Sequence, residues 1–230
     1  MLLRKAVAEA VGTGLLVLAV IGSGIAGSRL SDDAGMQLLV NALATAGGLG
    51  AIILALGPVS GAHLNPVVTL ADLVGGGLHA GEAAGYVAAQ VAGGAAGAVV
   101  ANLMFSEPAV ELSTQSRGSG ALWLSEAVAT FGLLVVILGV VRSGRVSVAP
   151  FAVAAYIGGA YFFTSSTSFA NPAVTVARSL SDTFAGIQPG SVPAFVACQV
   201  LGACLALALM RFLYPPLPAE IVLDQEMTDA

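Results

Sequence analysis

Two similar stretches decide how this chain folds: SGAHLNPVVT at residues 60–69 and TSFANPAVT at residues 167–175. In each, an Asn-Pro pair is followed by small or branched apolar residues and a Thr. Proline is favoured in the first turn of a helix, where its missing N–H would have no partner, and Asn is a favoured N-cap. Each pair therefore predicts a helix start, with short helices at 65–75 and 171–181.

Both stretches lie inside long segments without an acidic residue, Lys or Arg. These segments cover residues 36–71, which is 36 residues, and 146–177, which is 32 residues. One membrane span needs about 20 apolar residues, so each segment holds one span and a remainder. We interpret each remainder as a half-helix that re-enters the membrane. Irregular backbone at that depth is tolerated where it is buried or lines a wet cavity, so two such half-helices predict a shared polar route.

The composition is typical of an integral membrane protein. Of the 230 residues, 57% are hydrophobic and only 9% are charged. The net charge of −5 comes partly from the acidic tail and argues against a nucleic acid partner. No motif places a nucleophile beside a base, or His and acidic residues at metal-ligand spacing, so we expect neither an enzyme nor a metal or other cofactor.

Six apolar segments have the length of membrane-spanning helices. We place them at residues 6–26, 36–56, 81–104, 122–141, 146–163 and 192–212, with Gly57-Pro58 ending the second. With the half-helices they predict an all-α integral membrane fold. The expected units are a first repeat at 1–105, a connecting loop at 106–120, a second repeat at 121–213 and a polar cytoplasmic tail at 214–230.

The two halves repeat each other. Glu9 and Glu126 open matching stretches, the Asn-Pro pairs match in the same order, and Gln90 matches Gln199. Each half has three spans, an odd number, so the second copy is inverted relative to the first. The half-helices are then expected to enter from opposite sides and to meet near the membrane midplane.

The distribution of basic residues predicts the orientation. Six spans place both termini on one side, together with five basic residues against three on the other: Arg4, Lys5, Arg142, Arg145 and Arg211 against Arg29, Arg117 and Arg178. Basic residues favour the cytoplasmic side, so we expect cytoplasmic termini and a location in the inner (plasma) membrane.

These motifs resemble the aquaporin and aquaglyceroporin family. The two Asn-Pro boxes, the Glu-x-x-x-Thr opening of each half and the repeated Gln carry the resemblance over almost the whole chain. It implies a homotetramer in which each subunit has its own pore for small neutral solutes. The stretch NPAVTVARSLSD, residues 171–182, is most similar to the bacterial branch associated with arsenic resistance.

The resemblance also implies which residues line the pore. The boxes would contribute Asn65, Pro66, Val67, Asn171, Pro172 and Ala173, with both Asn side chains offering amide N–H donors to passing solutes. Counting from the boxes, the narrow selectivity filter falls on Thr45, Gly159, Ser168 and Val174. Most family members have Arg where this chain has Val174. We therefore expect a wide filter that passes polyols, undissociated arsenite and methylated arsenicals, unless neighbouring walls refill the space.

Arg178 lies one helical turn after Val174 on the same face. Helical side chains lean toward the N-terminus, so Arg178 is expected either to reach back over the outer mouth or to pair with Asp182 one turn further on. Asp72 holds the equivalent place in the first half, which predicts the opposite charge at the other mouth.

Glu9 and Glu126 are acids inside predicted spans, where a carboxylate is costly without partners. One interpretation is proton coupling. The other is that each carboxylate anchors a re-entrant loop by accepting hydrogen bonds from its N–H groups, with His63 as a partner of Glu9. Two functions remain open at this point: a passive channel, and a secondary transporter, which also uses inverted repeats and broken helices.

Overall fold

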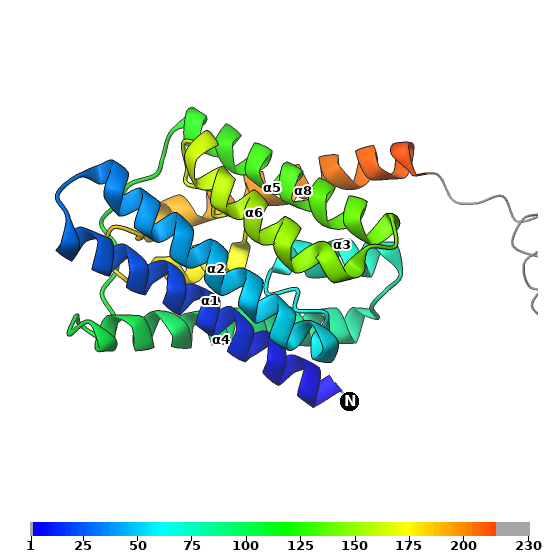
Figure 1. The fold of residues 1–230 in the computed structure, drawn as a ribbon, viewed down its shortest axis with the longest axis horizontal. Helices are drawn as coiled ribbons and strands as arrows, with labels where there is room; N and C mark the ends of the chain where they lie inside the picture. The colour runs from blue at the N-terminus through cyan, green and yellow to red at the C-terminus, as the bar shows by residue number, and fades with distance from the viewer. Residues whose placement is uncertain (1, 215–230) are drawn as a thin grey trace, which may run out of the picture.

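The computed structural model describes residues 2–214, and every regular element in that range is helical. Figure 1 shows the helices in chain order. The elements are α1 Leu2–Leu30, α2 Ala34–Ser60, α3 Pro66–Gly75, α4 Ala80–Met104, α5 Gly120–Arg142, the 3₁₀ turn η1 Val146–Val148, α6 Ala149–Phe163, α7 Pro172–Arg178, the 3₁₀ turn η2 Pro189–Ser191 and α8 Val192–Leu213.

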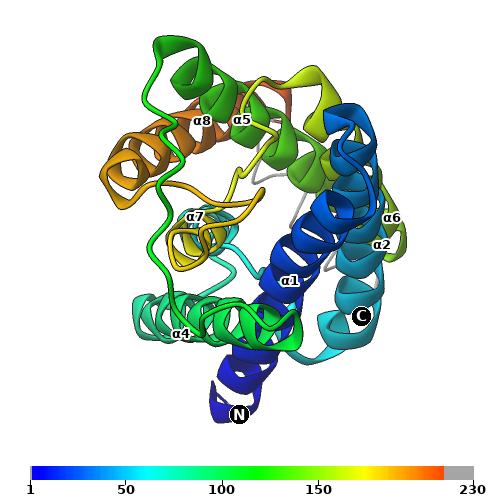
Figure 2. The same cartoon turned by 90° about the vertical axis from the view of Figure 1, so that its left-hand side faces the viewer.

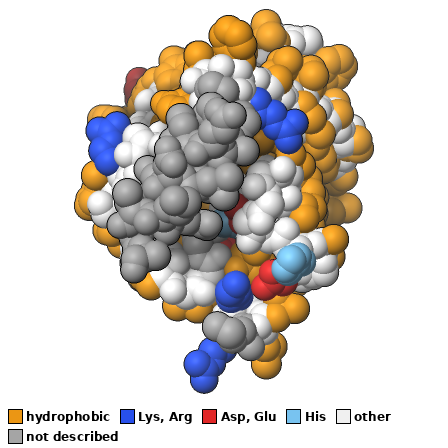
Figure 3. All heavy atoms as spheres, turned by 90° about the vertical axis from the view of Figure 1, so that its right-hand side faces the viewer, with side chains coloured by type: hydrophobic (Ala, Val, Ile, Leu, Met, Phe, Trp, Pro, Cys, Tyr) orange, Lys and Arg blue, Asp and Glu red, His pale blue; other side chains and the backbone are white. Residues whose placement is uncertain are grey.

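Six of these segments are long and apolar enough to cross a membrane, which confirms the expected all-α integral membrane fold. Large apolar side chains remain exposed along their outer faces, including Leu43, Leu124 and Leu205. Figure 3 shows one end of the molecule, where charged side chains are visible and apolar side chains dominate the flanks. An apolar belt between more polar ends is what a bilayer requires.

The two short helices lie inside the ring formed by the six long ones. Figure 2 shows α7 in the middle, surrounded by α1, α4, α5 and α8. The N-termini of α3 and α7 meet. Asn65, just before α3, donates to the Ala170 carbonyl in the loop before α7, and Asn171, just before α7, donates to the Leu64 carbonyl in the loop before α3. The half-helices therefore touch at their N-termini, as the inverted repeat predicts.

Glycines allow the long helices to approach each other closely. A Cβ on Gly93 of α4 would collide with the Ala10 carbonyl of α1, and one on Gly202 of α8 would collide with the Ala127 carbonyl of α5. Close backbone approach through small residues is the usual way in which membrane helices gain packing energy. The same contact occurs in both halves, so the repeat extends to the packing of the helices.

Two predicted boundaries were wrong. Gly57-Pro58 does not end the second span: α2 continues through Pro58 to Ser60 and stops at Gly61, whose φ of +88° is the left-handed value that glycine adopts freely. A proline near a helix end loses a single backbone hydrogen bond, and here the helix tolerates that loss. The fifth span keeps its predicted bounds, Val146–Phe163, and its first three residues form the 3₁₀ turn η1 before α6 starts.

The second half-helix ends at Arg178, three residues before its predicted end. Asn102 of α4 explains the stop, because its amide donates to the Leu180 carbonyl at 3.1 Å and its oxygen accepts from the Ser181 hydroxyl at 2.7 Å. These contacts divert the chain from the helical path. The predicted polar tail lies outside the described residues, apart from Tyr214.

Candidate functional site: a cavity between two opposed half-helices

Asn65 caps α3 and also bonds across the meeting point of the half-helices. Its side-chain oxygen accepts from the Val67 N–H at 3.1 Å, which satisfies one of the free donors of the first turn. Its amide nitrogen donates to the Ala170 carbonyl, in the loop before α7, at 2.8 Å. An amide group has two N–H bonds, so the second remains for another acceptor.

Asn171 makes the same contacts in reverse. Its oxygen accepts from the N–H groups of Ala173 and Val174, and its amide nitrogen donates to the Leu64 carbonyl, before α3, at 2.7 Å. The two side chains thus tie the loops together from opposite directions. Each also leaves one N–H, and two helix N-termini add partial positive charge at the same depth.

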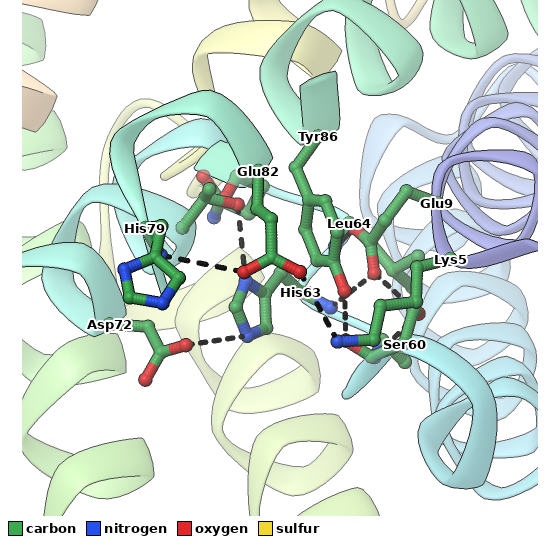
Figure 4. Close-up of polar contacts among 12 residues, drawn as sticks. Lys5, Glu9, Ser60, His63, Leu64, Asp72, His79, Glu82 and Tyr86 are labelled. Carbon is green, nitrogen blue, oxygen red and sulfur yellow. Dashed lines mark hydrogen bonds and ion pairs between the residues drawn. The ribbon is translucent and has the colours of Figure 1, made fainter. Parts of the chain in front are cut away.

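Glu9 anchors the loop before α3, as Figure 4 shows. Its carboxylate accepts from the Ser60 hydroxyl at 2.6 Å and from the backbone N–H groups of His63 and Leu64 at 2.9 and 2.7 Å. Gln90 adds a fourth donor at 2.8 Å. A fully buried carboxylate with four donors is well satisfied, so its burial requires no proton coupling. The contact to His63 uses the backbone and not the imidazole ring.

Glu126 anchors the loop before α7 with an equivalent network. The donors are the Ser166 hydroxyl at 2.6 Å, the N–H groups of Phe169 and Ala170 at 2.9 and 3.0 Å, and the Gln199 amide at 2.6 Å. The backbone here is strained, since Ala170 has a φ of +46°. Hydrogen bonds to a buried charge offset that strain and hold the loop in one conformation.

A cavity of about 310 Å³ passes the point where the half-helices meet. It extends from Asp72 of α3 to Arg178 of α7, and both Asn65 and Asn171 line it. Most of the remaining wall is apolar. It comes from four of the long helices and includes Leu16, Val20, Leu49, Ile53, Leu133, Ile137, Val153 and Ile157. The cavity is therefore a mostly apolar passage whose hydrogen-bonding groups are concentrated near the half-helices.

The structure corrects one of the four predicted filter residues. Gly159 is exposed on the outer face of α6 and does not line the cavity. Tyr161, two residues later, lines it together with Val153 and Ile157, which precede it at intervals of four residues on one helical face. The prediction failed because it counted backwards from Asn171 across a loop whose length the sequence does not fix. A large phenol therefore stands where we expected an open space.

The other three predicted filter residues line the cavity. The Thr45 hydroxyl and the Tyr161 hydroxyl are 3.0 Å apart and share a hydrogen bond. Ser168 is buried, and its hydroxyl has no hydrogen-bond partner among the described residues. Val174 contributes an apolar surface. The hydroxyls of Thr45 and Tyr161 are therefore hydrogen-bonded to each other, whereas the Ser168 hydroxyl has no hydrogen-bond partner among the described residues.

Arg178 lies at the same end of the cavity, which we call the arginine end and define by Phe169 and Arg178. Its guanidinium carbon is 3.4 Å from the centroid of the Phe169 ring, and its Nε donates to the Ala185 carbonyl. The predicted alternative of an ion pair with Asp182 is wrong. That carboxylate instead accepts from the backbone and side chain of Thr114 in the connecting loop.

Arg117, which sequence reasoning did not single out, supports the same ring from the connecting loop. Its guanidinium carbon is 5.0 Å from the Phe169 centroid, and its Nε donates to the Gly186 carbonyl at 2.9 Å. Burial lowers the pKa of Arg117, while the charge of Glu126 and the phenol of Tyr161 oppose that decrease. The ordinary pKa of an arginine is so high that the side chain remains cationic at neutral pH after this decrease.

The opposite end carries the opposite charge. We call it the aspartate end and define it by His63 and Asp72, both of which line the cavity and are labelled in Figure 4. The His63 Nε2 lies 3.7 Å from an Asp72 carboxylate oxygen, and its Nδ1 is 3.2 Å from the Thr69 hydroxyl. Glu82 lies nearby and pairs with Lys5 at 3.6 Å.

Two half-helices that meet at their N-termini inside six spanning helices, around a cavity lined by both, define a membrane channel. Comparison with known proteins then gives the family. The family profile described as Major intrinsic protein matches residues 1–168. The chain belongs to this family of channels and is not an enzyme.

Individual relatives agree with this assignment. The chain is 51% identical over 215 residues to aquaglyceroporin AqpS of Rhizobium meliloti (strain 1021), covering 94% of this chain and 92% of the relative. It is 32% identical over 229 residues to a probable aquaporin TIP-type alpha of Phaseolus vulgaris, covering 95% and 87%. The aquaglyceroporin of Plasmodium falciparum has a similar fold, with a TM-score of 0.71 at 19% identity over 90% of this chain and 95% of that one.

Proposed function

We propose that this protein is a passive channel for water, glycerol and other small uncharged solutes, including undissociated arsenite and methylated arsenicals. The observation that carries the proposal is the single cavity from Asp72 to Arg178, lined by apolar walls and by the two Asn side chains. Such a passage favours neutral solutes with hydroxyl groups, because it offers hydrogen bonds on a few atoms and no cage of oxygen ligands for a cation.

The family relationship favours a channel over a secondary transporter. A transporter that is driven by an ion gradient needs a titratable or ion-binding group at its central site. Here the centre holds amides, and the two buried carboxylates are each occupied by four donors. We further propose that the subunits assemble as a homotetramer in the inner membrane with cytoplasmic termini, so that the aspartate end faces the cytoplasm and the arginine end faces outward.

The test is stopped-flow measurement on proteoliposomes of water, glycerol and arsenite uptake. Fluxes that rise linearly with solute concentration and do not depend on ion gradients are expected. Val174→Arg is expected to lower glycerol and arsenite uptake far more than water uptake, because the new side chain fills the filter. Val174→Leu adds a smaller volume without charge, so it separates steric exclusion from charge and should give an intermediate loss.

Two results would overturn the proposal. Saturation of wild-type uptake, or its dependence on an ion gradient, would indicate a transporter. An unchanged solute profile in Val174→Arg would show that this part of the cavity does not limit passage. Native mass spectrometry of the purified protein tests the tetramer, and labelling of a Cys introduced at Ser143, in the α5–α6 connection, tests the orientation.

A further inference from the structure

The arginine end holds two cations without a carboxylate partner. Among residues 2–214 the ion pairs join Lys5 to Glu82, Arg29 to Glu107 and His63 to Asp72, and none involves Arg117 or Arg178. Only 2% of the Arg178 surface is exposed. A buried cation without a carboxylate in ion-pair contact is costly, so this site favours a small anion that supplies the contact.

The free donors of Arg178 are directed at the cavity. The terminal nitrogens of Arg178 make no hydrogen bond with any described residue, and they are not among the fully enclosed polar atoms that lack a partner. They therefore reach the cavity that Arg178 lines. The Ser168 hydroxyl also has no partner among the residues described, but its oxygen is enclosed. It reaches an anion only after its side chain rotates toward the cavity that Ser168 lines.

The Phe169 ring fixes the guanidinium orientation. Arg178 lies over it at 3.4 Å, and its Nε is held by the Ala185 carbonyl, so rotation of the planar group is restricted. A fixed guanidinium presents parallel N–H groups that match two oxygens of an oxyanion. Arg117 adds a second positive charge beside the same ring but does not line the cavity.

From this arrangement we propose that the arginine end binds a small oxyanion, such as phosphate or a simple carboxylate, which occupies the filter and blocks the passage of neutral solutes. Arg178 binds two oxygens, the Ser168 side chain rotates to donate to an oxygen of the same anion, and Arg117 contributes charge from outside the cavity. The anion stays at this end, because the apolar wall and the Asp72 carboxylate at the aspartate end oppose its transit.

This inference rests on the proposed channel function, and the experiment separates the two. Glycerol uptake into proteoliposomes is measured in sodium chloride and in sodium phosphate of equal osmolarity and ionic strength, with the same salt on both sides. Uptake in chloride tests the channel. The decrease in uptake caused by phosphate tests the anion site, and each variant is compared with its own uptake in chloride.

Phosphate is expected to lower wild-type uptake in a saturable manner. Arg178→Gln should weaken this inhibition by about tenfold or more, since it removes charge-assisted hydrogen bonds. Arg178→Lys keeps the charge but loses the paired N–H groups, so it should be intermediate. Ser168→Ala and Arg117→Gln should each cause a smaller loss. Arg29→Gln is the matched control, because Arg29 is exposed and already paired with Glu107, and its inhibition should equal that of wild type.

A second measurement covers the case in which Arg178→Gln fails to fold. Phosphate should raise the thermal unfolding temperature of the purified wild-type protein above its value in chloride, and the increase should be smaller for Ser168→Ala. Equal inhibition of wild type and Arg178→Lys by phosphate would overturn the proposal, because it would indicate a general charge effect. Equal uptake in chloride and in phosphate would also overturn it, because it would show that water in the cavity suffices to solvate Arg178.

Discussion

The two halves of the molecule share a scaffold and differ at their ends. Each half buries a glutamate that accepts from a serine hydroxyl, a glutamine amide and two consecutive backbone N–H groups, at distances that agree within a few tenths of an ångström. Each half also packs an aromatic ring edge-to-face against the ring of the residue two positions before its cavity Asn. The ring centroids of Tyr86 and His63 are 5.3 Å apart, and those of Phe195 and Phe169 are 5.2 Å apart.

The divergence lies in two pairs of equivalent residues. Asp72 and Arg178 each follow the cavity Asn by seven residues, and His63 and Phe169 each precede it by two. In the first half the side chains form an ion pair contact of 3.7 Å, and in the second a cation over a ring at 3.4 Å. The same backbone frame therefore carries charge of opposite sign at its two ends. The shared residues hold the loops, and the divergent residues set the electrostatics that a solute meets.

Replacing either anchor tests the shared scaffold most severely. Glu9→Gln and Glu126→Gln each replace one accepting carboxylate oxygen by an amide N–H₂ group. That buried group then faces N–H or O–H donors whose hydrogen bonds the carboxylate had accepted. Each should cost about 3–5 kcal/mol of folding stability, or a decrease of about 10 °C in apparent unfolding temperature. Differential scanning fluorimetry of the purified protein measures the decrease, and glycerol uptake should fall with it.

Glu107→Gln is the control for this pair. Glu107 is paired with Arg29 at 2.7 Å on an exposed surface, where such a pair contributes about 0–1 kcal/mol. Its unfolding temperature should stay close to the wild-type value. A large decrease in only one of the two anchor variants would break the equivalence of the halves and would point to a special role, such as proton coupling, for that carboxylate.

Neutralising the two ends tests the divergent residues. Arg178→Gln removes a cation from the cavity wall and should raise sodium or proton leak by about tenfold, as expected for the loss of about 1.4 kcal/mol of electrostatic barrier. Asp72→Asn should leave cation leak unchanged or lower it, because it removes an attractive charge. Dye-loaded liposomes under an imposed membrane potential measure both. Equal leak through the two variants would mean that the charge asymmetry does not control ion passage.

Local patterns determined most of what the sequence could predict. The Asn-Pro pairs, the uncharged segments and the odd number of spans per half were enough to predict the spans and the opposed half-helices, because helix starts and membrane lengths depend on nearby residues. The sequence also predicted that Glu9 and Glu126 accept hydrogen bonds from the N–H groups of their loops, since buried loop N–H groups need acceptors. The positions of Arg117, Phe169 and Tyr161 were not, because they depend on loop lengths and on contacts between distant segments.

Tyr161 and Gly159 offer a direct comparison of the corrected and the predicted filter. Tyr161→Ala should raise uptake of larger polyols relative to glycerol by about fivefold, which corresponds to about 1 kcal/mol of steric barrier. It also leaves the Thr45 hydroxyl without its partner. Tyr161→Phe removes only the hydroxyl and should change the polyol ratio little. Gly159→Ala adds a methyl group on the exposed face of α6 and should change nothing. If Gly159→Ala changed the polyol ratio and Tyr161→Ala did not, Gly159 and not Tyr161 would be the filter residue, as the sequence predicted.

The smallest expected effect is the energetic coupling between the two contacts that join the halves. Asn65 and Asn171 do not bond to each other, but each donates to the carbonyl that precedes the other, at 2.8 and 2.7 Å. Each single change to Ala should cost about 1–2 kcal/mol through the lost cap and hydrogen bond. Because the two side chains hold one shared junction, the double variant should cost less than the sum, with a coupling of about 0.5–1 kcal/mol in a double-mutant cycle of unfolding. Strict additivity would mean that the two loops are held independently by their glutamates, and that the halves meet at this junction without stabilising each other.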